Sequence, residues 1–339
     1  MSETVLVTEK EFAKAEPVFR HAKDFVVVAA PAEEVALADA VMKNSARVVI
    51  VGVERYAGPL YHALKSVSNG RQSLIARFGV GHDGVDKTLS RQHGIIVCNT
   101  PGALDISVAE HTLWLIGNLA RRIAQLDARM RAGAFTGETG RERHGKLLGV
   151  LGFGPIGRRV AAMARFGFGM RVWAAATANV EQLEAREKRS LAEIQTTCGL
   201  EHYTNNADEL FRECDFLSIH LPATPATRHF VNAAPLKLVK PGALLVNTAR
   251  GSVVDEAALC DALNHGPLAG AALDVFAREP YEPVAPGKVL RRLANVLLTP
   301  HVGSNTYEAN QRMAEACLAN EAHFFAGNLD RLTQVKPTL

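Results

Sequence analysis

The stretch LLGVLGFGPIG at residues 147–157 decides the fold of this chain. A short apolar run leads into Gly152, Gly154 and Gly157, an amphipathic segment follows, and a second apolar run covers Met170–Ala176. This strand–turn–helix–strand order is the context that the dinucleotide fingerprint G-x-G-x-x-G requires. The first glycine permits the tight turn, the second lets the backbone approach a pyrophosphate, and the third lets helix and strand pack closely. The glycines read alone are ordinary turn residues, but their flanking pattern favours nucleotide binding.

The composition is that of an ordinary globular protein with two domains. At 339 residues the chain exceeds the size at which single cores stop growing. A net charge of +3 without a Lys/Arg block predicts no nucleic-acid partner. The five cysteines form no C-x-x-C pair, which predicts free buried thiols in a reducing compartment and no metal site. No signal-peptide core and no apolar run of membrane-spanning length are found, so a cytoplasmic location without a membrane partner is expected.

The first hundred residues alternate short apolar runs with helical segments, which predicts a parallel sheet covered on both faces. The expected strands are residues 5–8, 25–30, 47–53, 73–78 and 95–99, and the expected helices are residues 10–21, 33–43, 59–66 and 86–93. The segment RFGVGHD, residues 77–83, follows the fourth strand. It is either an anion-binding nest of backbone N–H groups or a plain turn.

The second half continues the alternation. An apolar helix at residues 107–122 is placed between the two domains, and a polar loop, residues 132–146, precedes the fingerprint strand. Residues 180–198 have helical period and many charges, so one solvated surface helix without chemistry is expected. A closing helix at residues 308–325 has an apolar face suited to pack on the N-terminal domain. Further strands are expected at residues 215–220, 243–247, 270–274 and 296–299.

Three residues that carry chemistry follow late strands of the nucleotide domain. Arg250, Glu279 and His301 each lie just beyond a strand, at the sheet edge where α/β proteins bind ligands. The Arg fork suits a carboxylate or carbonyl oxygen. The imidazole can donate a proton to a carbonyl oxygen as hydride arrives, and the neighbouring carboxylate favours its charged form. A solitary His is more often structural, but the combination predicts dehydrogenation of a 2-hydroxy acid.

These segments closely resemble the D-2-hydroxyacid dehydrogenases. The family strings are RFGVGHDGVD, NTPGALDISVAEHTLWL, HGKLLGVLGFGPIGRRVA, PGALLVNTARGSVVDEAAL, GAALDVFAREP and LLTPHVGSNT, in family order over nearly the whole chain. The resemblance implies an α/β fold of two Rossmann-like domains with parallel sheets. Residues 1–100 with 305–339 would form a split, flavodoxin-like substrate domain, and residues 101–304 the dinucleotide-binding domain. The active site would lie in the cleft between them.

The resemblance also implies roles for individual residues. Arg250, Glu279 and His301 match the catalytic residues, and the backbone amides of Val80 and Gly81, with Arg250 and His301, match the substrate site. Asp274 matches the residue that contacts the nicotinamide carboxamide. The full set of expected cofactor contacts is Gly152, Gly154, Pro155, Ile156, Gly157, Ala176, Thr177, Leu221, Pro222, Thr227, Thr248, Ala249, Arg250, Asp274, His301 and Gly303. Family members are usually homodimers, formed partly through the helix at residues 107–122.

Three departures from the family pattern bear on specificity. Ala176 stands where an acid usually bonds the adenosine ribose, so repulsion of the NADP 2′-phosphate is absent. Thr177 or Asn179 can bond a phosphate, although no Arg follows immediately. We therefore expect NAD or NADP as cofactor, with NADP or dual use favoured. Residues 52–56, GVERY, differ from the polar pair common in relatives, and no regulatory domain for serine feedback is expected after the closing helix.

The predicted reaction is the reversible, stereospecific reduction of a small 2-keto acid to the D-hydroxy acid. Glyoxylate and hydroxypyruvate are the leading substrates, followed by phosphohydroxypyruvate. Formate dehydrogenases share the fold but pair the active-site His with Gln, and Glu279 argues against that reaction. An NADH-sensing co-repressor scaffold of the same fold retains the three polar residues. The lack of a long disordered tail disfavours it.

Overall fold

The computed structural model describes residues 3–335, which divide into two compact units. Unit 1 comprises the chain up to Leu104 and again from Ser304, and unit 2 comprises Asp105–Gly303. Both are α/β units built on an all-parallel sheet, which confirms the predicted fold class. No helix within residues 3–335 is long and apolar enough to cross a bilayer. The five cysteines are free and buried, as predicted.

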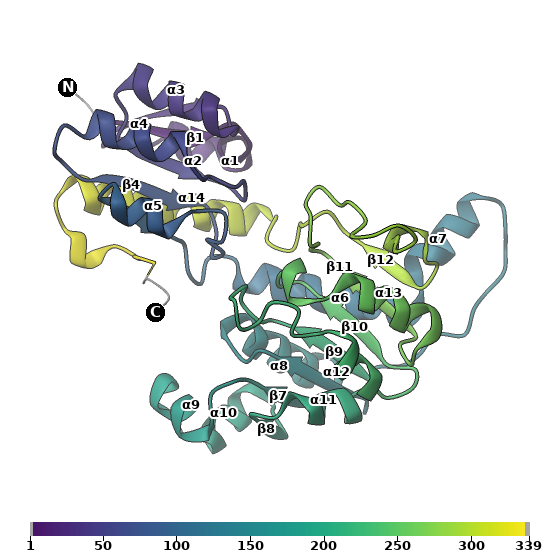
Figure 1. The fold of residues 1–339 in the computed structure, drawn as a ribbon. Helices are drawn as coiled ribbons and strands as arrows, with labels where there is room; N and C mark the ends of the chain where they lie inside the picture. The colour runs from purple at the N-terminus through teal and green to yellow at the C-terminus, as the bar shows by residue number, and fades with distance from the viewer. Residues whose placement is uncertain (1–2, 336–339) are drawn as a thin grey trace. The chain divides into compact units, whose positions relative to one another are not determined.

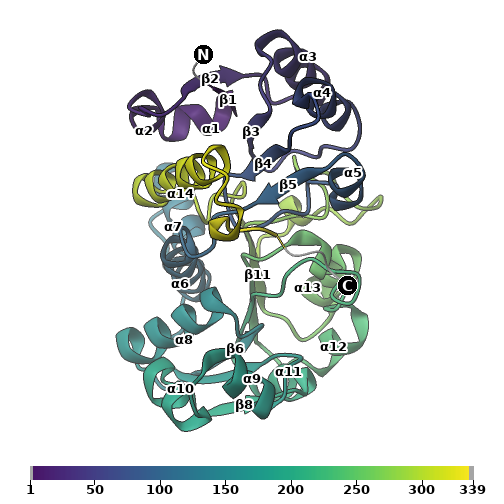
Figure 2. The same cartoon turned by 90° about the vertical axis from the view of Figure 1, so that its left-hand side faces the viewer.

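Unit 1 has a five-stranded sheet in the order β2-β1-β3-β4-β5, the flavodoxin-like order. Its strands are β1 Thr4–Thr8, β2 Val26–Ala30, β3 Val48–Val51, β4 Ser73–Arg77 and β5 Ile95–Cys98. Its helices are α1 Glu9–Lys14, α2 Glu16–Arg20, α3 Glu34–Asn44, α4 Pro59–Ser68, α5 Lys87–Gln92 and α14 Tyr307–Phe325. Helix α14 lies with α1 and α2 on one face, and α3, α4 and α5 lie on the other (Figure 2). The central strands β3 and β4 are buried on both faces, which explains the apolar run of β3 and the apolar centre of β4.

Unit 2 has a seven-stranded sheet in the order β12-β11-β10-β9-β6-β7-β8 (Figure 1). Its strands are β6 Leu147–Leu151, β7 Arg171–Ala175, β8 His202–Thr204, β9 Phe216–Ile219, β10 Leu244–Asn247, β11 Gly270–Leu273 and β12 Val296–Leu298. Its helices are α6 Asp105–Arg121, α7 Ile123–Arg131, α8 Pro155–Phe168, α9 Val180–Glu187, α10 Leu191–Cys198, α11 Ala207–Glu213, α12 Ala233–Leu238 and α13 Glu256–His265. The strand order reverses between β6 and β9, so the fingerprint turn lies at the switch point where such sheets bind ligands.

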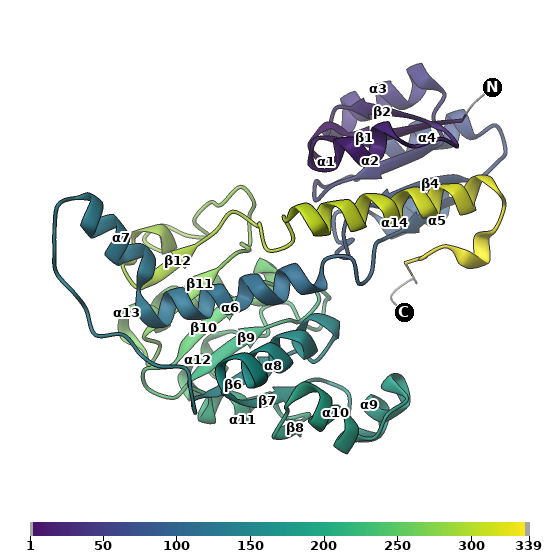
Figure 3. The same cartoon turned by 180° about the vertical axis from the view of Figure 1, so that it is seen from behind.

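Packing in unit 2 places the fingerprint helix and α6 on one face of the sheet. Helix α6 contacts β10 and β11, α8 contacts β6 and β7, and the two helices contact each other (Figure 3). Helix α6, expected between the domains, therefore belongs to unit 2. Helices α11, α12 and α13 cover the opposite face (Figure 1).

The structure corrects two helices and adds two elements. The segment 10–21 forms α1 and α2, because Ala15 leaves helical geometry at φ −142°. The segment 180–198 forms α9 and α10, because Lys188 adopts φ 53° and Ser190 starts a new capping box with Glu193. Helix α7 was not expected. It buries no residue, and its apolar side chains Ile123 and Met130 are exposed. Strand β8 has only three residues.

Candidate active site

The turn between β6 and α8 has the shape that a pyrophosphate needs. Gly152 adopts φ 100°, and a Cβ there would lie 2.6 Å from the carbonyl carbon of His220. A Cβ on Gly157 would overlap the carbonyl oxygen of Gly152, so this glycine allows helix and strand to touch. Gly154, the N-cap of α8, has open space where its Cβ would project. The space beside the start of α8 is therefore open at Gly154, and a helix N-terminus there fits a dinucleotide phosphate.

The remaining predicted cofactor residues follow neighbouring strands of the same sheet edge. Ala176 and Thr177 follow β7, Leu221, Pro222 and Thr227 follow β9, Thr248 and Ala249 follow β10, Asp274 follows β11, and Gly303 follows β12. Two threonine side chains bond within the protein. Thr227 accepts from the Thr224 backbone N–H at 2.9 Å, and Thr248 Oγ1 lies 2.8 Å from Thr112 Oγ1 of α6. Their side chains therefore hold loops in place.

The structure brings His301 and Glu279 into direct contact. His301 Nδ1 lies 2.7 Å from Glu279 Oε2, and the pair is about 30% exposed, at 28% and 31%. The other oxygen, Glu279 Oε1, accepts from the Phe276 backbone N–H at 3.0 Å. With Nδ1 occupied by the carboxylate, Nε2 is the ring atom left to exchange a proton with a bound molecule. His301 itself adopts φ 51°, unusual for a residue other than glycine.

Arg250 lies on the loop after β10, next to the loop that carries Glu279. The two loops touch at Gly251, where a Cβ would overlap the backbone carbonyl of Phe276. The Arg250 carbonyl accepts from Asn247 Nδ2 at 3.0 Å, and its guanidinium donates to the Ala249 carbonyl at 2.6 Å. Because β10, β11 and β12 are neighbours, Arg250 shares one sheet edge with the His301–Glu279 pair.

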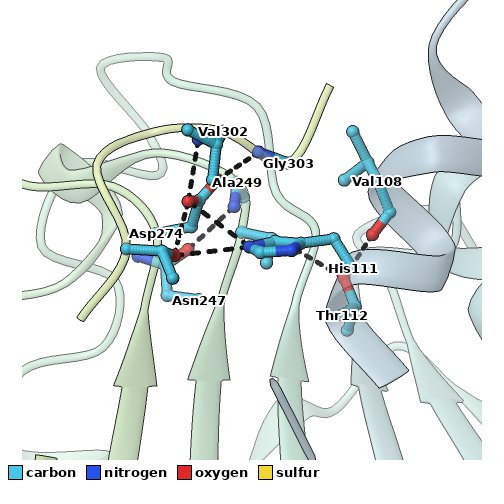
Figure 4. Close-up of polar contacts among 10 residues, drawn as sticks. Val108, His111, Thr112, Asn247, Ala249, Asp274, Val302 and Gly303 are labelled. Atoms are coloured by element: carbon cyan, nitrogen blue, oxygen red, sulfur yellow. Dashed lines mark hydrogen bonds and ion pairs between the residues drawn. The ribbon is translucent and has the colours of Figure 1, made fainter. Parts of the chain in front are cut away.

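Asp274 anchors the loop that carries His301 (Figure 4). Its Oδ1 accepts from Thr299 Oγ1 at 2.6 Å and from the Val302 N–H at 2.9 Å, and its Oδ2 accepts from the Gly303 N–H at 2.8 Å. Its backbone carbonyl accepts from the His301 N–H at 2.8 Å. This one residue therefore binds both sides of His301 and holds it in its left-handed conformation.

Helix α6 supplies a further partner for Asp274. His111 Nε2 lies 3.4 Å from Asp274 Oδ1 and 3.3 Å from Thr299 Oγ1 (Figure 4). Burial alone would raise the pKa of Asp274, but the hydrogen bonds from His111, Thr299 and the backbone outweigh it and keep the pKa below its ordinary value. His111 was not predicted to have a role, although it lies in the family segment SVAEHTLWL.

Glu256 is a second residue that sequence reasoning missed. It is buried at the start of α13, and its Oε1 accepts from the Ala277 backbone N–H at 2.6 Å. Ala277 lies within the loop that ends in Glu279, so Glu256 helps to position the carboxylate beside His301. Burial, together with the charge of Glu279, raises the pKa of Glu256. The residue belongs to the quoted string VVDEAAL, where its acid could have been noticed.

Val80 and Gly81 lie in unit 1, on the loop after β4. Asn99 Nδ2 donates to the Val80 carbonyl at 2.8 Å, and Thr100 N–H donates to the Gly79 carbonyl at 3.1 Å. The loop that carries Val80 and Gly81 is therefore held in place by hydrogen bonds to its carbonyl groups. The role of its amides toward a substrate stays a prediction.

A glycine-rich turn at the switch point and an imidazole–carboxylate pair at the same sheet edge are typical of a nucleotide-dependent oxidoreductase. Residues 113–303 match the family model for the D-isomer specific 2-hydroxyacid dehydrogenase, NAD binding domain. The chain is 40% identical over 268 residues to a glyoxylate reductase of Aeropyrum pernix, covering 76% of this chain and 75% of that one.

Solved structures agree with this match. The NADPH-dependent glyoxylate/hydroxypyruvate reductase of Sinorhizobium meliloti, in complex with NADP and malonate, has a TM-score of 0.76 at 30% identity, over 96% of this chain and 94% of that one. The D-lactate dehydrogenase of Aquifex aeolicus, complexed with NAD and lactic acid, has a TM-score of 0.77 at 30% identity, over 99% and 100%.

The chain belongs to the D-isomer-specific 2-hydroxyacid dehydrogenases, as the sequence motifs predicted. It is an NAD(P)-dependent oxidoreductase that acts on CH–OH groups, and the scaffold alternative is not favoured.

Proposed function

We propose that this chain reduces small 2-keto acids to D-2-hydroxy acids, with glyoxylate and hydroxypyruvate as leading substrates and phosphohydroxypyruvate behind them. The observation that carries the proposal is the 2.7 Å contact between His301 Nδ1 and Glu279 Oε2, at the sheet edge that also bears Arg250. The relatives named glyoxylate reductase and glyoxylate/hydroxypyruvate reductase support the choice of substrates.

The proposed mechanism assigns one task to each polar residue. When bound, the reduced nicotinamide supplies the hydride. His301 donates the proton on Nε2 to the carbonyl oxygen, and in the reverse direction it takes that proton back. Glu279 stabilises the imidazolium through Nδ1–H and fixes the ring orientation. Arg250 binds the substrate carboxylate or carbonyl oxygen through its planar fork.

The proposal also assigns roles to the two units. Unit 2 would hold the cofactor, with Asp274 toward the nicotinamide carboxamide and Gly303 as a further contact. Unit 1 supplies the backbone amides of Val80 and Gly81 for the substrate carboxylate. The resemblance to the family and the open phosphate-binding turn support this division.

The deciding experiment mixes the purified protein with NADH or NADPH and a panel of glyoxylate, hydroxypyruvate, pyruvate and phosphohydroxypyruvate. We expect loss of reduced-cofactor absorbance, with the highest kcat/KM for glyoxylate or hydroxypyruvate. In the reverse direction only the D isomer of a chiral product should be oxidised. Cofactor binding without turnover of any keto acid would contradict the proposal and favour a scaffold.

A homodimer formed through unit 2 is part of the same proposal. Trp114 on α6 is 70% exposed, and Ile123 and Met130 on α7 are more than half exposed, which supports an apolar contact surface there. Trp114→Asp should shift sedimentation of the protein towards the monomer, whereas Phe166→Asp on α8, an equally apolar exposed position, should not. A cytoplasmic location is supported by the free cysteines.

A further inference from the structure

Helix α9 brings an arginine to the fingerprint turn. Arg186 Nη2 donates to the carbonyl of Phe153 at 3.2 Å, and Phe153 is the residue between Gly152 and Gly154. Arg186 lies in the last turn of α9, which ends at Glu187 with Lys188 as its C-cap. The charged segment expected to carry no chemistry therefore places a cation on the nucleotide loop.

The arginine is one member of a small charged cluster. Glu187 Oε1 lies 2.9 Å from Arg186 Nε and 2.6 Å from Arg158 Nη1 of α8. Arg158 Nη1 also lies 3.4 Å from the Phe153 carbonyl oxygen. Two guanidinium groups thus share one carboxylate, and the cluster is left with net positive charge. Arg158 is largely buried, whereas the Arg186 side chain is 50% exposed and accessible to a ligand.

The loop after β7 is linked to the fingerprint turn through Tyr203. Tyr203 donates its hydroxyl to the Ala178 carbonyl at 2.8 Å, and its ring lies 5.9 Å from the ring of Phe153. Tyr203 therefore connects the loop after β7 to Phe153 of the fingerprint turn, the residue whose carbonyl Arg186 contacts.

This is the place where a dinucleotide's adenosine ribose is recognised. An acid at the end of the second strand bonds the ribose hydroxyls of NAD, and an arginine nearby accommodates the 2′-phosphate of NADP. This chain has Ala176 at the acid's position, and the Asn179 side chain caps α9 by accepting from the Gln182 N–H at 2.9 Å. Residues 176–179 therefore include no cationic side chain. Arg186 is an exposed arginine that contacts the fingerprint turn.

We propose that Arg186 of α9 binds the 2′-phosphate of NADP(H) and sets the cofactor preference of this chain. The proposal rests on the cofactor site of the proposed function, at Gly152–Gly157. A guanidinium fork binds phosphate oxygens through charge-assisted hydrogen bonds, so the loss of Arg186 should weaken phosphate-bearing ligands about tenfold to a hundredfold. Glu187, which faces the same guanidinium, opposes the binding of an anion.

The test is calorimetric binding to the full-length protein, without substrate. Four ligands are compared: NADP⁺, NAD⁺, 2′,5′-ADP and 5′-AMP. Arg186→Ala should weaken NADP⁺ and 2′,5′-ADP by the stated factor and leave NAD⁺ and 5′-AMP within about twofold. Arg212→Ala is the matched control, because Arg212 lies on α11 with its side chain also 50% exposed, and it should leave all four unchanged. Arg186→Lys should restore part of the affinity, because its charge is kept and its fork is lost.

A variant expected to bind NADP⁺ more tightly distinguishes direct binding by Arg186 from an effect of its loss on the structure. Glu187→Gln removes the competing charge and should tighten NADP⁺ and 2′,5′-ADP several-fold without tightening NAD⁺. The proposal is overturned if Arg186→Ala weakens NAD⁺ and NADP⁺ equally, if it changes neither, or if the unaltered protein does not bind 2′,5′-ADP more tightly than 5′-AMP. None of these readings depends on keto-acid turnover, so failure of the substrate proposal would be seen separately.

Discussion

Replacing Asp274 by Ala should destabilise unit 2 and disorganise the loop that carries His301. The Asp274 side chain is 2% exposed, and its oxygens accept from the backbone N–H groups of Val302 and Gly303. Both donors would lose a buried partner, at about 1–3 kcal/mol each, or about 4 kcal/mol together. Thr299 and His111 are not counted, because a hydroxyl can rotate and the imidazole is accessible to water. A loss of this size lowers the unfolding midpoint by about 8–16 °C.

The assay is thermal and urea unfolding of the full chain, paired with keto-acid turnover. Asp261→Ala is the matched control, since Asp261 lies on α13 with its side chain 59% exposed, and within residues 3–335 its ion-pair partner is Lys288 alone. The control should change the unfolding free energy by less than about 0.5 kcal/mol. If Asp274→Ala behaves like the control, the carboxylate does not anchor the loop and this reasoning is wrong.

The pH dependence of the unfolding free energy tests the role of Asp274 independently. The pKa of Asp274 is lowered in the folded protein, so its contribution to stability is present above the unfolded value, about 3.9, and is lost as pH falls through the folded value. The stability difference between the unaltered protein and Asp274→Ala should therefore be constant from about pH 5 to pH 7 and should shrink below about pH 4. A difference that grows on acidification would contradict the assignment.

Three further predictions concern other residues. His301→Gln should lower kcat by about 10²–10⁴-fold with cofactor binding retained, and His265→Gln, an exposed histidine on α13, is its control; near-normal turnover would remove His301 as the acid. Ala176→Asp should shift the kcat/KM ratio towards NADH, because the new carboxylate bonds ribose hydroxyls and repels a 2′-phosphate; an unchanged ratio would place the ribose elsewhere. Glu256→Gln keeps the oxygen that accepts from Ala277, whereas Glu256→Leu loses it. Because burial raises the pKa of Glu256, ionisation of its carboxyl lowers the stability of the folded protein as pH rises above about 4.3. The Gln variant should therefore equal or exceed the unaltered protein in stability at pH 7. The Leu variant should lose both stability and turnover. Equal damage from both variants would show that the hydrogen bond is unimportant.

Local signals in the sequence were sufficient for most of the fold. Strand runs such as Leu147–Leu151 are apolar throughout because both faces of a parallel sheet are covered, and this makes them easy to recognise. The glycine spacing located the turn, since only glycine fits at Gly152 and Gly157. The pairing of His301 with Glu279 was also expected, because residues that follow neighbouring parallel strands meet at one edge.

The amino-acid sequence by itself therefore determined the fold class, the nucleotide-binding turn and the residues after each strand. Tertiary structure alone decided which distant groups support them: His111 beside Asp274, Glu256 beneath the Glu279 loop and Arg186 on the Phe153 carbonyl. Backbone periodicity is a local property and can be read from neighbouring residues. A side-chain contact between α9 and the fingerprint turn joins residues far apart in the chain, so no local pattern predicts it. The break at Lys188 was missed for a related reason, because neither glycine nor proline marks it.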